Sequence, residues 1–518
     1  MDRKEQFKNQ ITEGYTFKSD AITIGGAILD GECLTGTHIK IPLKTLNRHG
    51  LVSGATGTGK TKTLQAIAEG LSSKSIPVFV MDIKGDFSGI ARAGTANPKV
   101  EERMQKIGLP YEPAGFPVEF LTISDEKGVR LRATVSEFGP VLFSKMLELN
   151  DAQEGVMAMI FKYCDDKKLP LLDLKDMKKM LQFISNEGKQ ELQDNYGNIS
   201  TTSVGTILRK VVELEQQKAD MFFGERSFDV NDLVRIDEEG RGIVSIIRLS
   251  DIQSKPKLFS TFLLCLLAEI YNTFPEAGDL DQPKLVMFID EAHLIFKEAT
   301  KTLLDQIESI IKLIRSKGVG VFFCTQNPID IPNSVLAQLG LKVQHALRAF
   351  TAKDRKEIKL ISENYPTSEF YKIEDLLTSL GIGEAAVSVL GEKGYPTPLS
   401  ATLVNAPRSR MDVLTPAEID EITGKSQLIK KYNEVIDRES AFEILTAKLN
   451  EVAKQQEEAE KEMAEQKEEK SSKEKTTVEK IVGSTTGRQI GRTVARELTR
   501  GLLGVLGIGS KSKKKSWF

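Results

Sequence analysis

Residues 54–61 have the types and spacing that phosphate chemistry needs. They read GATGTGKT, with a glycine at each end of a six-residue stretch and then lysine and threonine. A short apolar run precedes them and a helical pattern follows, which is the context of a P-loop. Glycines let backbone N–H groups approach phosphate oxygens, and the start of the helix adds partial positive charge. A glycine-rich turn with a chance lysine is the alternative, and this flanking pattern disfavours it.

The P-loop predicts two ligands, ATP and Mg²⁺. We expect Lys60 to contact the β- and γ-phosphates and the Thr61 hydroxyl to bind Mg²⁺. The residues predicted to bind the nucleotide are Gly54, Ala55, Thr56, Gly57, Thr58, Gly59, Lys60, Thr61 and Lys62.

An acidic pair follows a second apolar run, KLVMFIDEAH at residues 284–293. We expect Asp290 to hold Mg²⁺ and Glu291 to act as the general base that activates water. The alternative is a pair of acids that simply begins a helix. The P-loop upstream favours the catalytic interpretation, since hydrolysis needs both parts.

Polar residues also mark three other places. Gln326 leaves the strand pattern GVGVFFCTQ and is expected to contact the γ-phosphate or orient water. Asp82, Lys84 and Asp86 end the strand after the P-loop helix, but the sequence assigns them no role. Arg315 ends a helical pattern and has two open interpretations: a cation that complements the helix dipole, or an arginine finger serving a neighbouring subunit's ATP.

Composition excludes several classes of protein. The chain has 518 residues and a formal net charge of −2, so any nucleic-acid partner must be met by local basic patches. Its four cysteines form no CxxC pair, which disfavours a disulfide framework or a zinc site. The N-terminus shows no apolar signal core, and no apolar run approaches the roughly 20 residues of a membrane span. These features predict a cytoplasmic protein.

The elements that must position these residues alternate between strand and helix on both sides of a helical stretch. Alternation of this kind predicts an α/β fold with a mainly parallel sheet. Apolar positions three and four apart over residues 141–220 predict a helical insertion. Residues 451–475 are rich in Glu, Lys, Gln and Ala, which is typical of a solvated helix or coiled-coil arm.

The last part of the chain carries two opposed stripes. Ile490, Val494, Leu498 and Leu502 recur every four residues, offset by two from Arg488, Arg492, Arg496 and Arg500. On a helix this spacing gives an amphipathic basic segment. Packing on the core or on a neighbouring subunit is the favoured interpretation. Binding of nucleic-acid phosphates and contact with an anionic membrane surface stay open.

Together these motifs resemble a known family. IPLKTLNRHGLVSGATGTGKTKTLQ, MDIKGDFSGIA, FIDEAHLIF, LIRSKGVGVFFCTQNPIDIP and LGLKVQHALRAFTAKDR resemble the HerA-like helicases, specifically the bacterial YjgR-type subgroup, and HerA is similar to FtsK-type DNA pumps. The resemblance implies a RecA-like P-loop ATPase core, a hexameric ring with ATP between subunits, and DNA in the central pore. It also implies that Arg315 is the finger. HerA has a longer N-terminal module, so its protein partner is not carried over.

The sequence therefore predicts an ATP-hydrolysing ring motor, a DNA translocase or helicase. Two alternatives remain, an ATP-switched scaffold and a motor that acts on protein. The predicted parts are a small N-terminal β element (1–46), the first part of the ATPase core (47–138), a helical insertion (139–235), the second part of the core (236–407), a charged helical arm (408–475) and a basic amphipathic tail (476–518).

Overall fold

The computed structural model describes residues 2–250, 256–298, 301–434, 436 and 438–473. The chain forms two compact units. The first contains residues 1–134, 145–148 and 214–436, and the second contains residues 135–144, 149–213 and 437–518. The predicted basic tail, with its arginine stripe, lies outside the described residues.

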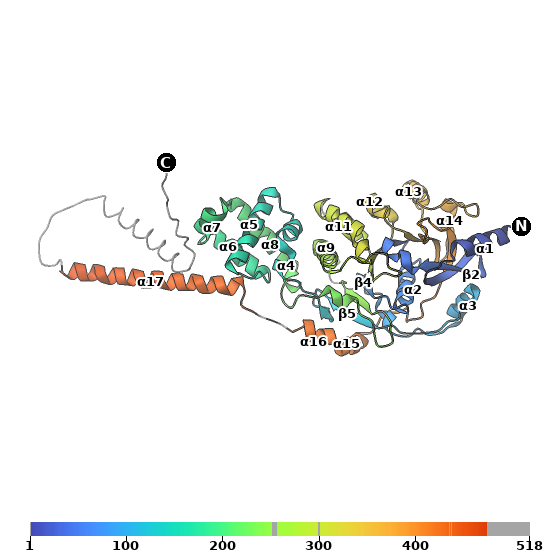
Figure 1. The fold of residues 1–518 in the computed structure, drawn as a ribbon, viewed down its shortest axis with the longest axis horizontal. Coiled ribbons are helices and arrows are strands. Elements are labelled where there is room, and N and C mark those ends of the chain that lie inside the picture. Colours follow the sequence, from blue (N-terminus) through green and yellow to red (C-terminus); the bar gives the residue numbers. More distant parts are fainter. Residues whose placement is uncertain (1, 251–255, 299–300, 435, 437, 474–518) are drawn as a thin grey trace. The chain divides into compact units, whose positions relative to one another are not determined.

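The first unit is built on a sheet of twelve strands (Figure 1). In spatial order the strands are β2 (Glu32–Pro42), β1 (Ala21–Leu29), β12 (Ser400–Val404), β11 (Glu384–Ser388), β10 (Leu341–His345), β3 (Gly50–Ser53), β9 (Val319–Thr325), β8 (Leu285–Ile289), β4 (Val78–Asp82), β7 (Val244–Arg248), β5 (Val118–Thr122) and β6 (Val129–Arg130). In this order, each neighbouring pair from β2 as far as β10 is antiparallel. Each neighbouring pair from β10 to the last strand, β6, is parallel. The predicted α/β fold with a mainly parallel sheet is confirmed.

Strand register brings the predicted motifs to one edge. Ser53 of β3 lies opposite Thr325 of β9, so the P-loop and Gln326 leave the sheet side by side. Met81 of β4 lies opposite Ile289 of β8, so the acidic residues after these strands are also neighbours. Parallel strands buried on both faces are mainly apolar, and the polar residues of these motifs follow the strand ends.

Helices of the first unit connect and cover these strands. They are α1 (Arg3–Gly14), α2 (Lys60–Ser72), α3 (Pro98–Ile107), α9 (Pro256–Thr273), α10 (His293–Glu298), α11 (Lys301–Ile314), α12 (Asn333–Leu336), α13 (Ala352–Ser362), α14 (Ile373–Ser379), α15 (Pro416–Lys425) and α16 (Gln427–Tyr432). The P-loop helix α2 packs against β1, β3 and β4. The Thr415 side chain caps α15 and Pro416 occupies its first turn.

Three local features differ from the sequence expectations. The sequence did not indicate α1, which buries only Phe7 and Ile11 and therefore shows a weak helical pattern. The strand-like run VQHALRAF at residues 343–350 belongs to β10 only as far as His345, and the next carbonyl, that of Ala346, accepts a hydrogen bond from the Ala55 N–H of the P-loop. The N-terminal strands β1 and β2 extend the central sheet, since β1 pairs with β12.

The second unit is helical. It is built from α4 (Val135–Met146), α5 (Asp151–Lys167), α6 (Leu174–Ser185), α7 (Lys189–Tyr196), α8 (Thr201–Gln216) and α17 (Ala441–Lys473). The buried Asp176 of α6 ties the start of α17 to this unit. Its Oδ1 accepts hydrogen bonds from the Ser440 hydroxyl at 2.5 Å and the Phe442 N–H at 2.8 Å. The charged arm therefore starts from a packed junction with α6.

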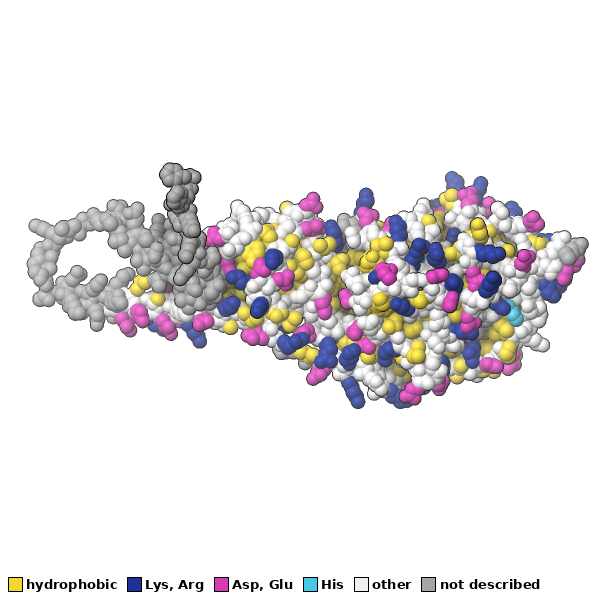
Figure 2. All heavy atoms as spheres, viewed as in Figure 1, with side chains coloured by type: hydrophobic (Ala, Val, Ile, Leu, Met, Phe, Trp, Pro, Cys, Tyr) yellow, Lys and Arg dark blue, Asp and Glu magenta, His cyan; other side chains and the backbone are white. Residues whose placement is uncertain are grey.

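Charge on the described surface is mixed. On the face shown in Figure 2, lysine and arginine side chains are interspersed with aspartate and glutamate. This distribution agrees with the net charge of −2. Within the described part of the chain, no helix combines the length and apolar character needed to cross a membrane.

Candidate functional site

The P-loop connects β3 to α2 and is fixed by close packing. A Cβ added at Gly54 would lie 2.5 Å from the His345 Cβ, so only glycine fits there. Gly59 caps α2 in the left-handed region, with φ of 111°. The Ala55 N–H donates a hydrogen bond of 2.9 Å to the Ala346 carbonyl, which anchors the loop to the chain leaving β10. The loop thus has the glycine-dependent conformation that the P-loop motif predicts.

Lys60 and Thr61 lie where the motif predicts. Lys60 is buried, with 6% of the residue exposed, and its ammonium donates to the carbonyls of Gly54 at 2.6 Å and Ala55 at 3.0 Å. Burial lowers the pKa of Lys60, and the positive charge of Lys84 lowers it further. The Thr61 hydroxyl donates a hydrogen bond of 3.2 Å to Asp86. Lys60 and Thr61 therefore both lie at the start of α2, in contact with the P-loop and with Asp86 respectively.

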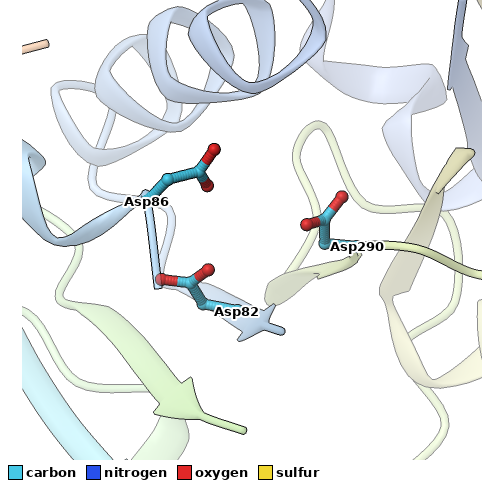
Figure 3. A group of neighbouring side chains, drawn as sticks. All are labelled: Asp82, Asp86 and Asp290. Atoms are coloured by element: carbon cyan, nitrogen blue, oxygen red, sulfur yellow. The ribbon is translucent and has the colours of Figure 1, made fainter. Parts of the chain in front are cut away.

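Three carboxylates meet beside Thr61. The side chains of Asp82, Asp86 and Asp290 point toward a common space, with their ligand oxygens all within 4.8 Å of one another (Figure 3). Burial, together with the charge of Asp86, raises the pKa of Asp82 to about 7. Burial also raises the pKa of Asp290 to about 6, against the opposing effect of Lys84. Such an all-oxygen set fits Mg²⁺, which binds carboxylates and keeps several waters.

Asp82 also shapes the loop that presents Asp86. Its two carboxylate oxygens accept hydrogen bonds from the N–H groups of Gly85 at 2.8 Å and Phe87 at 3.1 Å. Gly85 has a φ of 76°, which the tight turn requires. The turn projects Lys84 and Asp86 toward the ends of β4 and β8.

Glu291 is buried and held from two sides. Its backbone has a φ of 46°, a left-handed conformation that non-glycine residues adopt at a cost and that clusters at functional sites. One carboxylate oxygen forms an ion pair with the Lys84 ammonium, and the other lies 2.9 Å from His293 Nδ1. Burial alone would lower the pKa of Lys84, but the bond to Glu291 and the charge of Asp290 outweigh burial and raise it.

Gln326 reaches the P-loop directly. Its amide oxygen accepts a hydrogen bond of 3.2 Å from the Thr56 hydroxyl. Lys62, the last predicted nucleotide-binding residue, instead bonds along α2 to Gln65 at 3.2 Å. The structure thus brings together the predicted P-loop, Asp290, Glu291 and Gln326, and their roles stay predictions.

The structure does not bring Arg315 to this group. Arg315 lies in the 3₁₀ turn Arg315–Lys317, just before β9 begins, whereas the site lies past the other end of the strand. The seven residues of β9 span about 20 Å. Within one chain, therefore, Arg315 lies at the opposite edge of the sheet from Lys60.

One buried residue beside the site escaped the sequence analysis. His345 ends β10, next to β3, and its ring contacts the Thr63 hydroxyl at 2.9 Å and the Glu384 carbonyl at 2.8 Å. Burial lowers its pKa to about 4. The rule that pointed to Gln326, a polar residue at the end of a strand beside the P-loop, also applies to His345.

Comparison with known proteins agrees with this site. The family described as helicase HerA-like C-terminal matches residues 29–513. The chain belongs to this HerA-like family. The YjgR-type subgroup stays a prediction.

Curated HerA-like relatives share the core at low identity. The DNA double-strand break repair helicase HerA of Sulfurisphaera tokodaii is 24% identical over 379 residues, covering 70% of this chain and 66% of the relative. The protein of the same name from Sulfolobus acidocaldarius is 22% identical over 360 residues, covering 68% of this chain and 64% of the relative. The chain thus spans slightly less than two thirds of these relatives.

Solved structures agree on the fold. The unbound monoclinic form of the bacterial conjugative coupling protein TrwBdeltaN70 matches with a TM-score of 0.51 and 14% identity, covering 79% of this chain and 95% of that one. The expected RecA-like P-loop core of this HerA-like chain is confirmed.

Proposed function

We propose that this chain is the ATP-hydrolysing subunit of a ring motor that acts on DNA. The observation that carries the proposal is the meeting of Lys60, Thr61, Asp290 and Glu291 at one edge of the parallel sheet. The P-loop supplies the phosphate cradle, and the acids follow the strand that ends nearby. A cradle beside a buried acidic pair suits phosphoryl transfer to water.

Four oxygen donors fit Mg²⁺. Thr61 and Asp290 are the ligands expected from the motifs, and Asp86 and Asp82 lie within reach of the same position. Mg²⁺ bound there would neutralise charge on the β- and γ-phosphates. The raised pKa values of Asp82 and Asp290 support a site that favours a cation.

Hydrolysis needs a base and a group that orients water. Glu291 is buried at the end of β8, and its carboxylate is suited to accept a proton from water. Gln326 bonds the P-loop at Thr56, so its amide lies close to the nucleotide. We assign Glu291 as the general base and Gln326 as the orienting residue.

We infer that the active form is an oligomer, a hexamer by analogy with the family. Arg315 lies at the edge of the sheet opposite Lys60, so it can serve only the ATP site of a neighbouring subunit. A finger supplied in this way makes catalysis depend on assembly.

DNA is the proposed polymer. The relatives from Sulfurisphaera tokodaii and Sulfolobus acidocaldarius are described as DNA double-strand break repair helicases, and we infer DNA in the pore of the ring from that likeness. All four cysteines are unpaired, which supports a reducing compartment such as the cytoplasm.

ATPase rates test the proposal. They would be measured on assembled protein with single-stranded DNA, with double-stranded DNA and without DNA. The expected result is stimulation by at least one form of DNA and loss of turnover in Lys60→Ala. Equal ATPase rates in all three conditions would favour the ATP-switched scaffold or the motor that acts on protein. Absence of ATPase activity in every condition would contradict the proposal.

A further inference from the structure

Lys84 occupies a position that the proposed mechanism does not use. It lies two residues past the end of β4, and Glu291 lies two residues past the end of β8, the strand that pairs with β4. Its ammonium forms the ion pair with Glu291 described above. The Lys84 side chain is 35% exposed, whereas that of Glu291 is 6% exposed. The lysine can therefore move while the carboxylate is enclosed.

The pairing of Glu291 opposes its proposed role. Lys84 holds one oxygen, and His293 Nδ1 lies 2.9 Å from the other. A general base needs a lone pair directed at water. While Lys84 is paired with one oxygen of Glu291 and His293 lies beside the other, neither oxygen is open to a water.

Two lysines converge on the same region. The positive charge of Lys84 depresses the pKa of Lys60, and both ammonium groups interact with Asp290 and Glu291. Lys60 is the P-loop lysine, whose partner in a bound nucleotide is the β- and γ-phosphate pair. Lys84 is therefore a second cation near the P-loop lysine, held by its ion pair with Glu291.

We propose that Lys84 is a further phosphate-contacting residue that exchanges Glu291 for the γ-phosphate of ATP. A γ-phosphate carries more charge than one carboxylate and offers three oxygens to an ammonium. The exchange frees Glu291 to accept a proton from water, so the base becomes competent only when a triphosphate is present. ADP lacks the γ-phosphate and leaves the ion pair intact. This inference rests on the proposed ATPase function.

A purely structural Lys84 makes a different prediction. If it served only to neutralise the buried Glu291, its loss would change the affinities for ADP and ATP by the same factor. A γ-phosphate contact changes only the affinity for the triphosphate. The ratio of the two affinities therefore separates the two roles without any measurement of turnover.

The experiment is equilibrium binding of Mg²⁺-ADP and of a non-hydrolysable Mg²⁺-ATP analogue, competed against a fluorescent nucleotide. The variants are Lys84→Met, Glu291→Gln and the double variant, which removes both charges and so leaves no buried carboxylate unpaired. Lys106→Met is the matched control, because Lys106 also forms an ion pair, with Glu102, but on exposed α3.

Lys84→Met lacks one charge-assisted contact, so it should bind the ATP analogue about tenfold or more weakly than the parent does. Its affinity for ADP should stay within about twofold of that of the parent. Glu291→Gln should bind the analogue more tightly than the parent does, because no ion pair has to break. Adding Lys84→Met should abolish that gain, and Lys106→Met should match the parent.

The role of Lys84 would be overturned if Lys84→Met and the double variant both lost affinity for ADP and for the analogue by the same factor. It would also be overturned if neither variant lost affinity for either nucleotide. A parent protein that binds neither nucleotide would instead overturn the proposed ATPase function. The two failures are therefore distinguishable.

Discussion

The Thr61 hydroxyl donates a hydrogen bond of 3.2 Å to the Asp86 carboxylate, which joins the first turn of α2 to the loop after β4. Two proposed Mg²⁺ ligands from separate elements are thus neighbours. Burial raises the pKa values of Asp82 and Asp290, and repulsion by the charge of Asp86 raises them further. A divalent cation would relieve this repulsion.

Asp86→Asn should therefore reduce the stabilisation by Mg²⁺. We expect Mg²⁺ to raise the melting temperature of the parent and to raise that of Asp86→Asn much less. Without Mg²⁺ the variant should be at least as stable as the parent, because one repulsive charge is gone. Thermal unfolding at several Mg²⁺ concentrations measures both effects. Asp375→Asn, at an exposed ion pair with Lys372, is the control, and a full Mg²⁺ shift in Asp86→Asn would remove Asp86 from the site.

Lys60→Ala and Glu291→Gln should separate binding from chemistry. Lys60→Ala removes a charge-assisted phosphate contact and should weaken nucleotide binding by about 10- to 100-fold. Glu291→Gln keeps the shape of the side chain but cannot act as a base, so it should bind ATP and hydrolyse it slowly. Binding and single-turnover measurements distinguish these effects. Turnover at the parent rate in Glu291→Gln would show that Glu291 is not the base.

Much of the site follows from sequence because its motifs are local. The P-loop and the pair Asp290–Glu291 each lie within one short segment, and the apolar strand before each segment predicts that they share a sheet edge. Register could not be predicted, because it depends on which strands are neighbours. Only the pairing of β4 with β8 brings Lys84 to Glu291 and Asp86 toward Asp290.

The antiparallel edge of the sheet, formed by β2, β1, β12 and β11, could not be predicted for a related reason. The sequence predicts a small N-terminal β element over residues 1–46, and only the pairing of β1 with β12 places its strands in the central sheet. α1 buries two apolar side chains on an otherwise polar segment, so its helical period is weak and tertiary contacts decide its structure. Long-range pairing, rather than local propensity, settles these elements.

Arg315→Ala should disable catalysis in assembled protein while leaving nucleotide affinity nearly unchanged. A finger that stabilises charge in the transition state contributes ~10³-fold or more to the rate. Lys312→Ala, an exposed cation on α11, is the matched control. Mixing Arg315→Ala with Glu291→Gln subunits should restore part of the activity, because some interfaces then combine an intact finger with an intact base. Normal turnover by Arg315→Ala would move the search to Arg348 and Arg355.

His49 should make folding sensitive to acid. Its Nδ1 accepts a hydrogen bond from the Val321 N–H at 3.0 Å and its Nε2 donates to the Ile311 carbonyl at 2.8 Å, so the ring is neutral. Burial lowers its pKa from 6.5 to about 4. The unfolded chain therefore binds the proton first, and the stability that His49 contributes is present above pH 6.5 and is lost as the pH falls toward 4.

Urea unfolding of the parent and of His49→Gln measures this effect. The difference in unfolding free energy should shrink by at most about 1.4 kcal/mol per pH unit within that window. The raised pKa values of Asp82 and Asp290 act with the opposite sign, but they cancel in the comparison. A difference that stays constant from pH 7 to pH 4 would contradict the neutral, buried ring.

The central claim, ATP-driven movement on DNA, is tested most directly by displacement of streptavidin from biotinylated DNA ends. Both single-stranded and double-stranded DNA would be used, with the parent and with Glu291→Gln as the folded control. We expect the parent to displace streptavidin from at least one substrate with ATP but not with ADP, and Glu291→Gln not to displace it. If the assembled parent hydrolyses ATP at the same rate without DNA and never displaces streptavidin, the protein is not a DNA motor.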